Sequence, residues 1–389
     1  MTRFDDRPRF PRGFRCASRN AGLKASGKDL SLFASDTPAA AAALFTRNHF
    51  PGAPIQVGRE LVRGGLLQAV VVNSKVSNVA TGEEGVEHAR RMGRAAASEL
   101  GIAPELVLMS STGVIGRRLP IEKIEAGLVG MAAELGEDPV VGAEGIMTTD
   151  RVPKAFSLRI GDALLTGVGK GAGMIAPNLA TMLVYFFTDA EVPAAELDAL
   201  LREAARDSFQ LLSVDTDTST SDTVAILANG RAGRVDPEAL LGGLRALSIR
   251  MAEAIARDGE GATKLLRARV SGAASDDEAR RIARAIVESP LIKTMAYGAD
   301  PNVGRILMAV GKCFECHIVP GRVGARLQGI EVVRGGAASP VDEGRLRALL
   351  AGDPVEIEVE LGVGAGTARA FGCDLTEGYI HENAAYASS

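Results

Sequence analysis

The chain has 389 residues, of which 46% are hydrophobic and 24% are charged, and its formal net charge is −4 at pH 7. This composition is typical of a globular protein, and the length fits one large domain or two ordinary ones. The negative charge argues against nucleic acid or an anionic membrane as a partner, because both require a concentrated basic face. No run of about 18 or more apolar residues occurs, so no membrane-spanning helix is predicted.

The cysteine content and the first residues point to a cytoplasmic protein. The 4 cysteines, Cys16, Cys313, Cys316 and Cys373, are too few and too scattered for a disulfide framework. The opening MTRFDDRPRF lacks the apolar core of a secretory signal. We therefore expect a cytoplasmic location.

Hydrophobic periodicity predicts an α/β protein with mixed sheets. In chain order, the predicted elements are strands at 29–34 and 67–73, a helix at 83–101, a strand at 105–110, a hairpin around Gly161-Asp162, a strand at 182–190, and helices at 193–212 and 236–258. From about residue 265 the alternation resumes, with a strand at 268–273, a helix at 276–289, an apolar core segment at 305–313 in the position of the next strand, and a half-buried strand at 352–362. No internal repeat or linker separates an independent module.

The segment from Lys170 to Thr181, KGAGMIAPNLAT, precedes the predicted strand at 182–190. It is not a phosphate-binding loop, because that motif places its lysine after the glycines and ahead of a helix. One interpretation is a tight turn that leads into a core strand. The other is a cleavage site, since a Thr that becomes the first residue of a new chain can use its own α-amine as a base. Ala180 and Thr181 supply the small residue and the hydroxyl that such a site needs.

This segment resembles the signature of the ornithine acetyltransferase family, the ArgJ type, also called glutamate N-acetyltransferases. In that family a KG-x-GM-x-AP-x-x-ATML pattern surrounds the point of self-cleavage. The resemblance extends over nearly the whole chain, through Ala43–Asn48, Ser111–Gly116, Met147–Asp150, Asp215–Thr223, Asp258–Thr263, Asp300–Arg305 and Asn383–Ser388.

The resemblance implies a layered α/β fold of the DmpA/ArgJ type, with mixed sheets flanked by helices and a chain that cuts itself between Ala180 and Thr181. Residues 1–180 would form an α chain, and 181–389 a β chain that contains a smaller α/β lobe at roughly 266–345 and a C-terminal tail returning to the site. The two chains would associate as α2β2 or a larger assembly.

The implied reaction is a ping-pong transfer of an acetyl group from N2-acetylornithine to glutamate through an acetyl-Thr181 intermediate, in arginine biosynthesis. Thr112 and Gly113 would stabilise the oxyanion, which is usually the largest contribution to catalysis of acyl transfer. The remaining substrate contacts carried over from the family are Thr148, Lys170, Thr181, Glu260, Asn383 and Ser388. No cofactor or metal is implied, and acetyl-CoA is a further acyl donor in bifunctional members.

Each of these residues also has a plainer interpretation. Without the family, Lys170 and Glu260 would be solvated surface residues, and Asn383 and Ser388 would be residues of a frayed tail. The polar run 215–223 would be an exposed loop or a buried hydrogen-bonded turn near the site, and we favour the buried turn.

Cysteine spacing and two departures from the family pattern complete the sequence evidence. Cys313-Phe-Glu-Cys316-His317 spells a haem-attachment or half-zinc pattern, but free thiols are the simpler interpretation. Lys75 and Val76 replace Gly and Asn of the family, and Val303 stands where Trp is common. These departures keep open a pathway-specific N-acyltransferase with a different amino-acid-like donor or acceptor. Two further alternatives are an amidase or aminopeptidase of the same fold and a non-catalytic relative that binds an amino acid.

Overall fold

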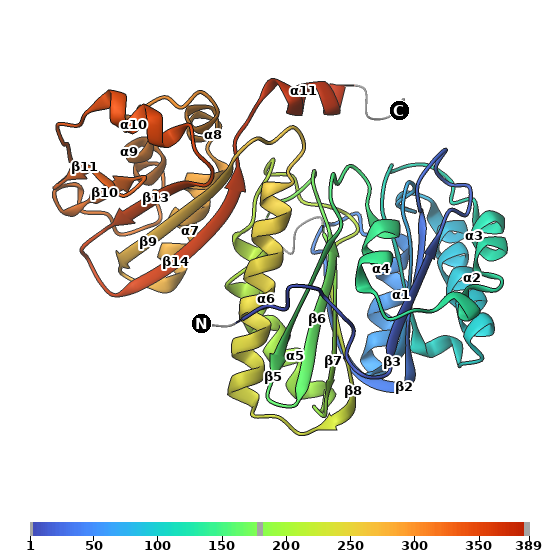
Figure 1. The fold of residues 1–389 in the computed structure, drawn as a ribbon. Coiled ribbons are helices and arrows are strands. Elements are labelled where there is room, and N and C mark those ends of the chain that lie inside the picture. The colour runs from blue at the N-terminus through green and yellow to red at the C-terminus, as the bar shows by residue number, and fades with distance from the viewer. Residues whose placement is uncertain (1–2, 177–181, 385–389) are drawn as a thin grey trace. The chain divides into compact units, whose positions relative to one another are not determined.

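The computed structural model describes residues 3–176 and 182–384, and the chain divides into two compact units, each described by itself. The first unit comprises Met1–Gly171, Asn178–Arg206 and Thr218–Met251, and the second comprises Ala172–Pro177, Asp207–Asp217 and Ala252–Ser389. Both units contain a mixed sheet flanked by helices (Figure 1). The expected layered α/β class is confirmed.

The first unit is built on an 8-stranded sheet of order β4-β3-β2-β8-β7-β6-β5, with β1 paired to β2. Its strands are β1 (Phe14–Arg19), β2 (Leu30–Phe45), β3 (Leu66–Asn73), β4 (Val107–Ser111), β5 (Lys154–Ile160), β6 (Ala163–Lys170), β7 (Leu183–Ala190) and β8 (Thr223–Gly233). Its helices are α1 (Ala53–Leu61), α2 (Gly82–Leu100), α3 (Ile121–Leu128), α4 (Pro139–Ile146), α5 (Ala194–Arg206) and α6 (Pro237–Arg257), whose last residues belong to the second unit.

Strand β2 folds this sheet back on itself. Its register slips between Ala34 and Ala39, so that its first half pairs with β1 and β3 and its second half with β8. The Phe33 ring stacks on Phe187 of β7 with centroids 5.5 Å apart, and it lies 5.8 Å from Tyr185. The two halves of the sheet therefore face each other across a shared apolar core. The ends of β3 and β4 lie side by side at Asn73 and Ser111, and both Lys75, after β3, and Lys170, at the end of β6, act on the pKa of Lys24.

Helices cover the outer faces of this folded sheet. Helix α2 buries a stripe that includes Met92 and Ala96 against the β1–β4 half, together with α3. The stripe ends at Gly101, whose left-handed conformation (φ 66°) caps the helix by donating back to the carbonyls of Ala97 and Ser98. On the other half, Gly167 and Gly169 of β6 leave room for the side chains of Leu247 and Met251 of α6. A Cβ at Gly169 would lie 2.7 Å from the Met251 sulfur of α6, whereas one at Gly167 would press on the Phe186 ring of β7 at 3.0 Å and on Leu247 at 3.3 Å.

The second unit contains a 6-stranded sheet of order β12-β11-β10-β13-β9-β14. Its strands are β9 (Leu265–Ala273), β10 (Gly324–Leu327), β11 (Ile330–Arg334), β12 (Ala337–Ala338), β13 (Val355–Glu360) and β14 (Gly366–Cys373). Its helices are α7 (Asp276–Glu288), α8 (Pro290–Tyr297), α9 (Gly304–Gly311), α10 (Glu343–Leu350) and α11 (Glu377–Ala384). Apolar side chains of α7 to α10 pack on one face of this sheet.

Two sequence predictions are wrong: one assigns the wrong type of secondary structure, and the other extends a helix too far. The segment 305–313 is a helix, α9, because its apolar residues Ile306, Ala309 and Val310 recur at helical spacing against the core. Helix α5 ends at Arg206 rather than near residue 212. Leu211, which continues the apolar pattern of α5, belongs to the core of the second unit instead.

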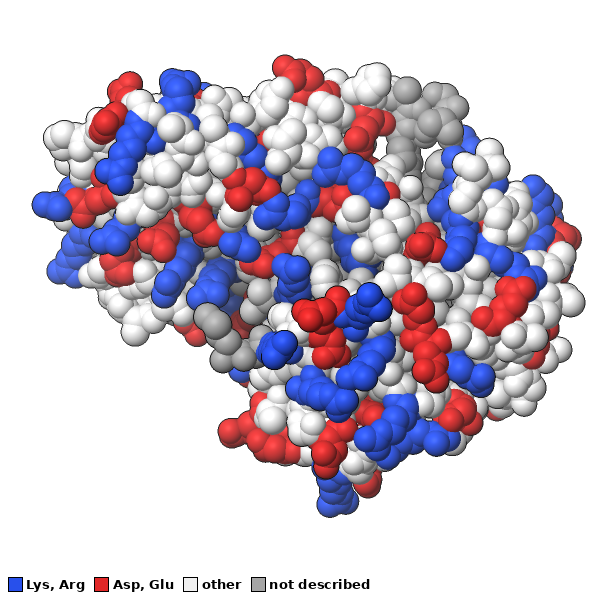
Figure 2. All heavy atoms as spheres, viewed as in Figure 1, with Lys and Arg blue, Asp and Glu red and all other residues white. Residues whose placement is uncertain are grey.

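Surface charge is mixed in both units. On the face drawn in Figure 2, acidic and basic side chains alternate over short distances, as the small net charge suggests. Within the described residues, no helix is long and apolar enough to cross a membrane.

Candidate active site

One edge of the sheet in the first unit brings together the end of β6 and the starts of β7 and β8. The sheet register aligns Lys170 at the end of β6 with Leu183 at the start of β7, and Leu183 with Thr223 at the start of β8. Just before these strands, the Met182 amide donates a 3.1 Å hydrogen bond to Oδ1 of Asp222, and the Thr223 amide donates to the Met182 carbonyl. Asp222 therefore lies beside the first described residue after the expected cleavage point.

Asp222 is unusual because it is a buried carboxyl with an incomplete set of partners. The residue is 1% exposed, and Oδ2 has no hydrogen-bond partner among residues 3–176 and 182–384. Burial raises the pKa of Asp222 well above its ordinary value, and the nearby Lys170 opposes that rise. Such an acid holds its proton at higher pH than an exposed aspartate.

A second carboxyl, that of Asp150, interacts with two lysines at this edge, Lys154 and Lys170. Its Oδ1 accepts from Nζ of Lys154 and from the Gly171 amide, both at 2.7 Å, and its Oδ2 accepts from the Thr148 amide at 3.0 Å. Burial would raise the pKa of Asp150, but Lys154 and Lys170 outweigh it and hold the pKa below its ordinary value. Asp150 thus fixes two candidate substrate contacts. It binds the backbone amide of Thr148, and it positions Lys170 both by binding the amide of the next residue, Gly171, and by attracting the lysine's charge.

The candidate oxyanion residues follow β4 at the same edge. Thr112 is buried, and its amide donates to the Asn73 carbonyl at 3.0 Å. Gly113 has a φ of 131°, and a Cβ there would lie 2.2 Å from the carbonyl carbon of Lys75. Lys75 itself has a φ of 79°, which is strained for a residue with a side chain. Only glycine fits at 113, because the loop that begins at Asn73 presses against it.

Positive charge accumulates near this loop. Burial lowers the pKa of Lys24. The carboxylates of Asp29 and Asp150 oppose that fall, and the more weakly acting cations Lys170 and Lys75 add to it. The Lys24 ammonium donates to the Met147 carbonyl at 2.7 Å, directly before Thr148. Lys24, Lys75 and Lys170 therefore lie near one another, together with the carboxylates of Asp29 and Asp150.

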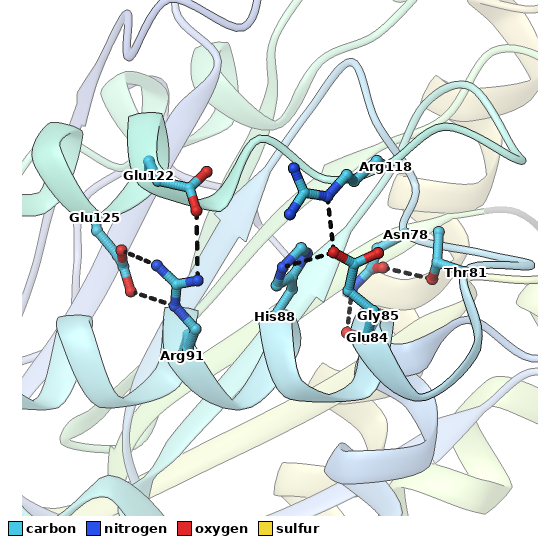
Figure 3. A network of polar contacts seen from close by, with 9 residues as sticks. All are labelled: Asn78, Thr81, Glu84, Gly85, His88, Arg91, Arg118, Glu122 and Glu125. Atoms are coloured by element: carbon cyan, nitrogen blue, oxygen red, sulfur yellow. Dashed lines mark hydrogen bonds and ion pairs between the residues drawn. The ribbon is translucent and has the colours of Figure 1, made fainter.

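Polar contacts join the segments that follow Lys75 and Gly113 to the start of α2 (Figure 3). Nδ2 of Asn78 donates to the Gly85 carbonyl at 2.9 Å, which fixes the segment after Lys75 to the start of α2. Arg118 donates to Glu84 at 2.8 Å, which fixes the segment after Gly113 to the same helix. Both sides of the Lys75–Gly113 contact are therefore tied to α2.

The second unit carries the other candidate contacts. Glu260 is 8% exposed, and its Oε2 accepts from Nδ2 of Asn383 in α11 at 2.8 Å. Its amide donates to the Ala172 carbonyl, and a Cβ at Gly173 would lie 2.2–2.4 Å from the Glu260 carboxylate. The Glu260 carboxylate therefore occupies room that is open only because residue 173 is a glycine.

Asp215 organises the last described residues before the expected cleavage point. Its carboxylate accepts from the amides of Met174 at 2.6 Å and Ile175 at 2.8 Å. Burial raises the pKa of Asp215 to about 6, while these amides oppose the rise. The polar run 215–223 is divided: Ser219–Thr223 is buried in the first unit, as favoured from the sequence, whereas Thr216 and Asp217 are exposed.

Comparison with known proteins identifies the family. The ArgJ family model matches residues 15–388. The bifunctional arginine biosynthesis protein ArgJ of Thermus thermophilus is 47% identical over 97% of this chain and 99% of its own length. ArgJ 2 of a Nostoc species is 43% identical over 97% of this chain and 98% of its own length.

The chain belongs to the ArgJ family. A solved ArgJ structure from Bacillus halodurans is 38% identical, with a TM-score of 0.50, and the match covers 52% of this chain and 98% of that chain. The glutamate N-acetyltransferase Oat2 of Streptomyces clavuligerus is 42% identical over 98% of this chain and 99% of its own length.

Three site residues expected from the ArgJ pattern, Ala180, Thr181 and Ser388, lie outside the described residues. Sequence reasoning assigned no role to Asp150, Asp215 or Asp222, although all three lie in motifs that carried the resemblance. The only sequence feature that marks these three residues is an aspartate placed shortly before a strand or near the Gly-rich segment. Such an aspartate is ordinary until the fold shows that it is buried and next to a lysine or a backbone amide.

Two other sequence features have structural explanations. Val303, where Trp is common in the ArgJ family, precedes α9 and packs against the core of the second unit. Cys313 and Cys316 are free thiols, and burial raises the pKa of Cys313 to about 11. Among the described residues, no group of three or more His, Cys, Asp or Glu side chains is arranged to hold a metal ion.

Proposed function

We propose that this ArgJ-family acetyltransferase cuts itself between Ala180 and Thr181 and then moves an acetyl group from N2-acetylornithine to glutamate through acetyl-Thr181. The observation that carries the proposal is the group of buried charges beside Met182. Lys170 and Asp222 are 3% and 1% exposed, and Asp222 accepts the Met182 amide. Charges this deeply buried are a hallmark of sites that bind or transform charged groups.

The first half-reaction is acyl transfer to Thr181. The α-amine of the new chain, with an ordinary pKa of about 7.7–8, is partly neutral near pH 7 and takes the hydroxyl proton. The hydroxyl oxygen attacks the acetyl carbonyl of acetylornithine, and the negative charge on the carbonyl oxygen is stabilised by Thr112 and Gly113. The proton then passes to the departing amine of ornithine. In the second half-reaction the amine of glutamate attacks the acetyl ester by the same steps in reverse.

Substrate recognition follows from charge. We assign the α-carboxylate of either substrate to Lys170 and Thr148, where Asp150 fixes the lysine's strand end and the Thr148 amide. We assign the free amine of the ornithine part to Glu260, which Asn383 orients at 2.8 Å. Thr181 and Ser388 complete the proposed contacts.

The proposal implies two associated chains, 1–180 and 181–389, in an α2β2 or larger assembly. The solved Bacillus halodurans ArgJ chain supports this, because it is matched almost entirely by about half of this chain. We expect the enzyme in the cytoplasm, where amino-acid substrates are made. Acetyl-CoA as an additional acyl donor would make it bifunctional, as the names of its relatives state for them.

A second candidate, transfer with a different amino-acid-like donor or acceptor, is suggested by Lys75, which replaces the Gly of the family pattern. Its backbone touches the candidate oxyanion residue Gly113, and it adds a cation to the environment of Lys24. An acidic acyl donor, unlike acetylornithine, would bring a second carboxylate to that charge. Screening acetylated amino acids against amine acceptors separates this candidate from the acetylornithine–glutamate pair.

The test supplies acetylornithine with and without glutamate and measures ornithine, acetate and acetylglutamate. A transferase releases ornithine in amounts matched by acetylglutamate, and it releases little acetate without an acceptor. Acetate release at an equal rate without glutamate would identify a hydrolase instead. The Glu260→Gln variant should raise KM for acetylornithine, while Glu238→Gln, a substitution of an exposed residue at the start of α6, should leave it unchanged.

A further inference from the structure

Self-cleavage poses a problem that the mature enzyme does not have. In the mature enzyme the α-amine of Thr181 serves as the base, but in the uncut chain that nitrogen is an amide and accepts no proton at neutral pH. A different group must therefore take the hydroxyl proton during maturation. That group has to lie close to residue 181, because a general base acts within hydrogen-bond reach or through one water.

We propose that Asp222 is the general base of self-cleavage, taking the Thr181 hydroxyl proton in the uncut chain. The inference rests on the proposed cleavage between Ala180 and Thr181. Its geometric basis is the 3.1 Å hydrogen bond from the Met182 amide to Oδ1 of Asp222. Met182 is covalently bonded to residue 181, so this bond holds the carboxyl beside the residue that must react.

The second oxygen of the carboxyl is the one that acts. Oδ2 is buried and has no hydrogen-bond partner in the described part of the chain. A buried carboxylate oxygen without a partner is unfavourable by several times the thermal energy, so its persistence calls for a ligand or a proton. The hydroxyl of the nucleophile supplies that proton.

The surroundings tune Asp222 for this task. Burial raises the pKa of Asp222 well above its ordinary value, which makes its carboxylate a stronger base than an exposed aspartate. Lys170, which is also buried, opposes the rise, and so does the hydrogen bond from the Met182 amide. The Thr46 amide also donates to the Asp222 carbonyl at 3.0 Å, so the end of β2 fixes the backbone of Asp222.

The proposed step balances as an acyl shift followed by hydrolysis. The Thr181 hydroxyl oxygen bonds to the Ala180 carbonyl carbon while its proton moves to Asp222. The bond between the Ala180 carbon and the Thr181 nitrogen then breaks, and Asp222 returns the proton to that nitrogen. One water cleaves the resulting ester, which leaves a carboxylic acid on Ala180 and restores the Thr181 hydroxyl.

Asp222→Asn tests the step while keeping an acceptor oxygen for the Met182 amide. Full-length Asp222→Asn is purified, and loss of the 389-residue precursor is followed by intact mass. We expect cleavage at least about a hundredfold slower than in wild type, the scale of general-base catalysis. Asp222→Glu keeps the carboxylate and should recover part of the rate.

The matched control is Asp189→Asn, at the other end of β7. Asp189 is also buried, at 2% exposed, and its Oδ1 accepts one backbone amide, that of Leu164, at 2.7 Å. This variant should cleave like wild type. Cleavage of Asp222→Asn at the wild-type rate, or equal slowing in both variants, would overturn the proposal.

The pH profile separates a base from a merely structural residue. The wild-type cleavage rate should rise with pH as Asp222 loses its proton, whereas the residual rate of Asp222→Asn should lose that dependence. An unchanged profile would count against the proposal. Failure of the proposed function looks different: there, Thr181→Ala would still divide into two chains, or wild type would never divide.

Discussion

Gly113 lies so close to the backbone of Lys75 that a Cβ at position 113 would be 2.2 Å from the Lys75 carbonyl carbon and 2.3 Å from its oxygen. Gly113→Ala should therefore move the oxyanion loop, lowering kcat by about 10²–10³, the effect of losing one oxyanion donor. It should also lower the free energy of unfolding, measured in urea, by about 2 kcal/mol or more. The added Cβ would clash with backbone atoms of Lys75, which cannot move aside as the end of a flexible side chain can.

The control for that substitution is Gly116→Ala in the same loop. Gly116 also has a positive φ, 79°, but a Cβ there meets nothing within 4 Å. Its loss of stability should be only the conformational strain of about 1 kcal/mol, with kcat nearly unchanged. Equal effects of the two substitutions on kcat would contradict the contact-based account of Gly113.

Lys75→Gly should improve stability and weaken the preference for acidic acceptors. The residue adopts a φ of 79°, so glycine removes a strain of about 1 kcal/mol, part of which is offset by the greater freedom of glycine in the unfolded chain. Loss of the cation should lower the kcat/KM ratio of glutamate over glutamine about tenfold. Competition between the two acceptors measures that ratio. Gln328→Gly, at φ 52° in the second unit, should leave the ratio unchanged.

Asp150→Asn should be one of the most destabilising conservative substitutions in the first unit. It leaves Lys154, whose side chain is 1% exposed, buried without its carboxylate, and breaking a buried pair in this way typically lowers stability by about 3–5 kcal/mol. Asp198→Asn breaks a 2.7 Å pair with Arg202 in which both side chains are well exposed, so we expect no more than about 1 kcal/mol. Urea unfolding of both variants provides the comparison.

The same residue sets a pH dependence of stability. Its pKa lies below the ordinary 3.8, so the folded chain binds fewer protons at Asp150 than the unfolded chain does in the window below 3.8. The stability from Asp150 is therefore complete above that window and is lost as pH falls through the folded pKa. Unfolding free energy measured from pH 5 down to pH 2 should fall more steeply in wild type than in Asp150→Asn. Parallel curves would exclude Asp150 as the source.

Gly173→Ala tests the placement of Glu260 without a large loss of stability. The added Cβ would meet the Glu260 carboxylate at 2.2–2.4 Å, and that carboxylate is the end of a flexible side chain that can swing away. We expect the unfolding free energy to change by less than about 1 kcal/mol. KM for acetylornithine should rise about tenfold as the amine contact is displaced. Gly321→Ala, where a Cβ meets nothing within 4 Å, should change neither quantity.

Much of this organisation was accessible from local sequence patterns. The apolar stripe of α2, the hairpin of β5 and β6, and the buried strand β7 were predicted because their periodicity and turn residues are local. The second half of β2 was not predicted, because its run of alanines has no strand preference of its own. Pairing with β8 makes that segment extended.

The site was only partly predictable for the same physical reason. Lys170 and Glu260 were found through motif resemblance, whereas the roles of Asp150 and Asp222 depend on burial and on neighbours far away in the sequence. Asp222 reaches Met182 only because β7 and β8 are parallel neighbours that start at the same level. No spacing along the chain encodes that contact.

The measurement that tests the central claim most directly is the intact mass of the purified protein before and after brief exposure to acetylornithine. The account predicts two chains, 1–180 and 181–389, with one added acetyl group on Thr181 of the second chain that disappears when glutamate is added. The Thr181→Ala variant should remain a single unmodified chain. A wild-type protein that stays whole, or an acetyl group carried on any other residue, would contradict the account.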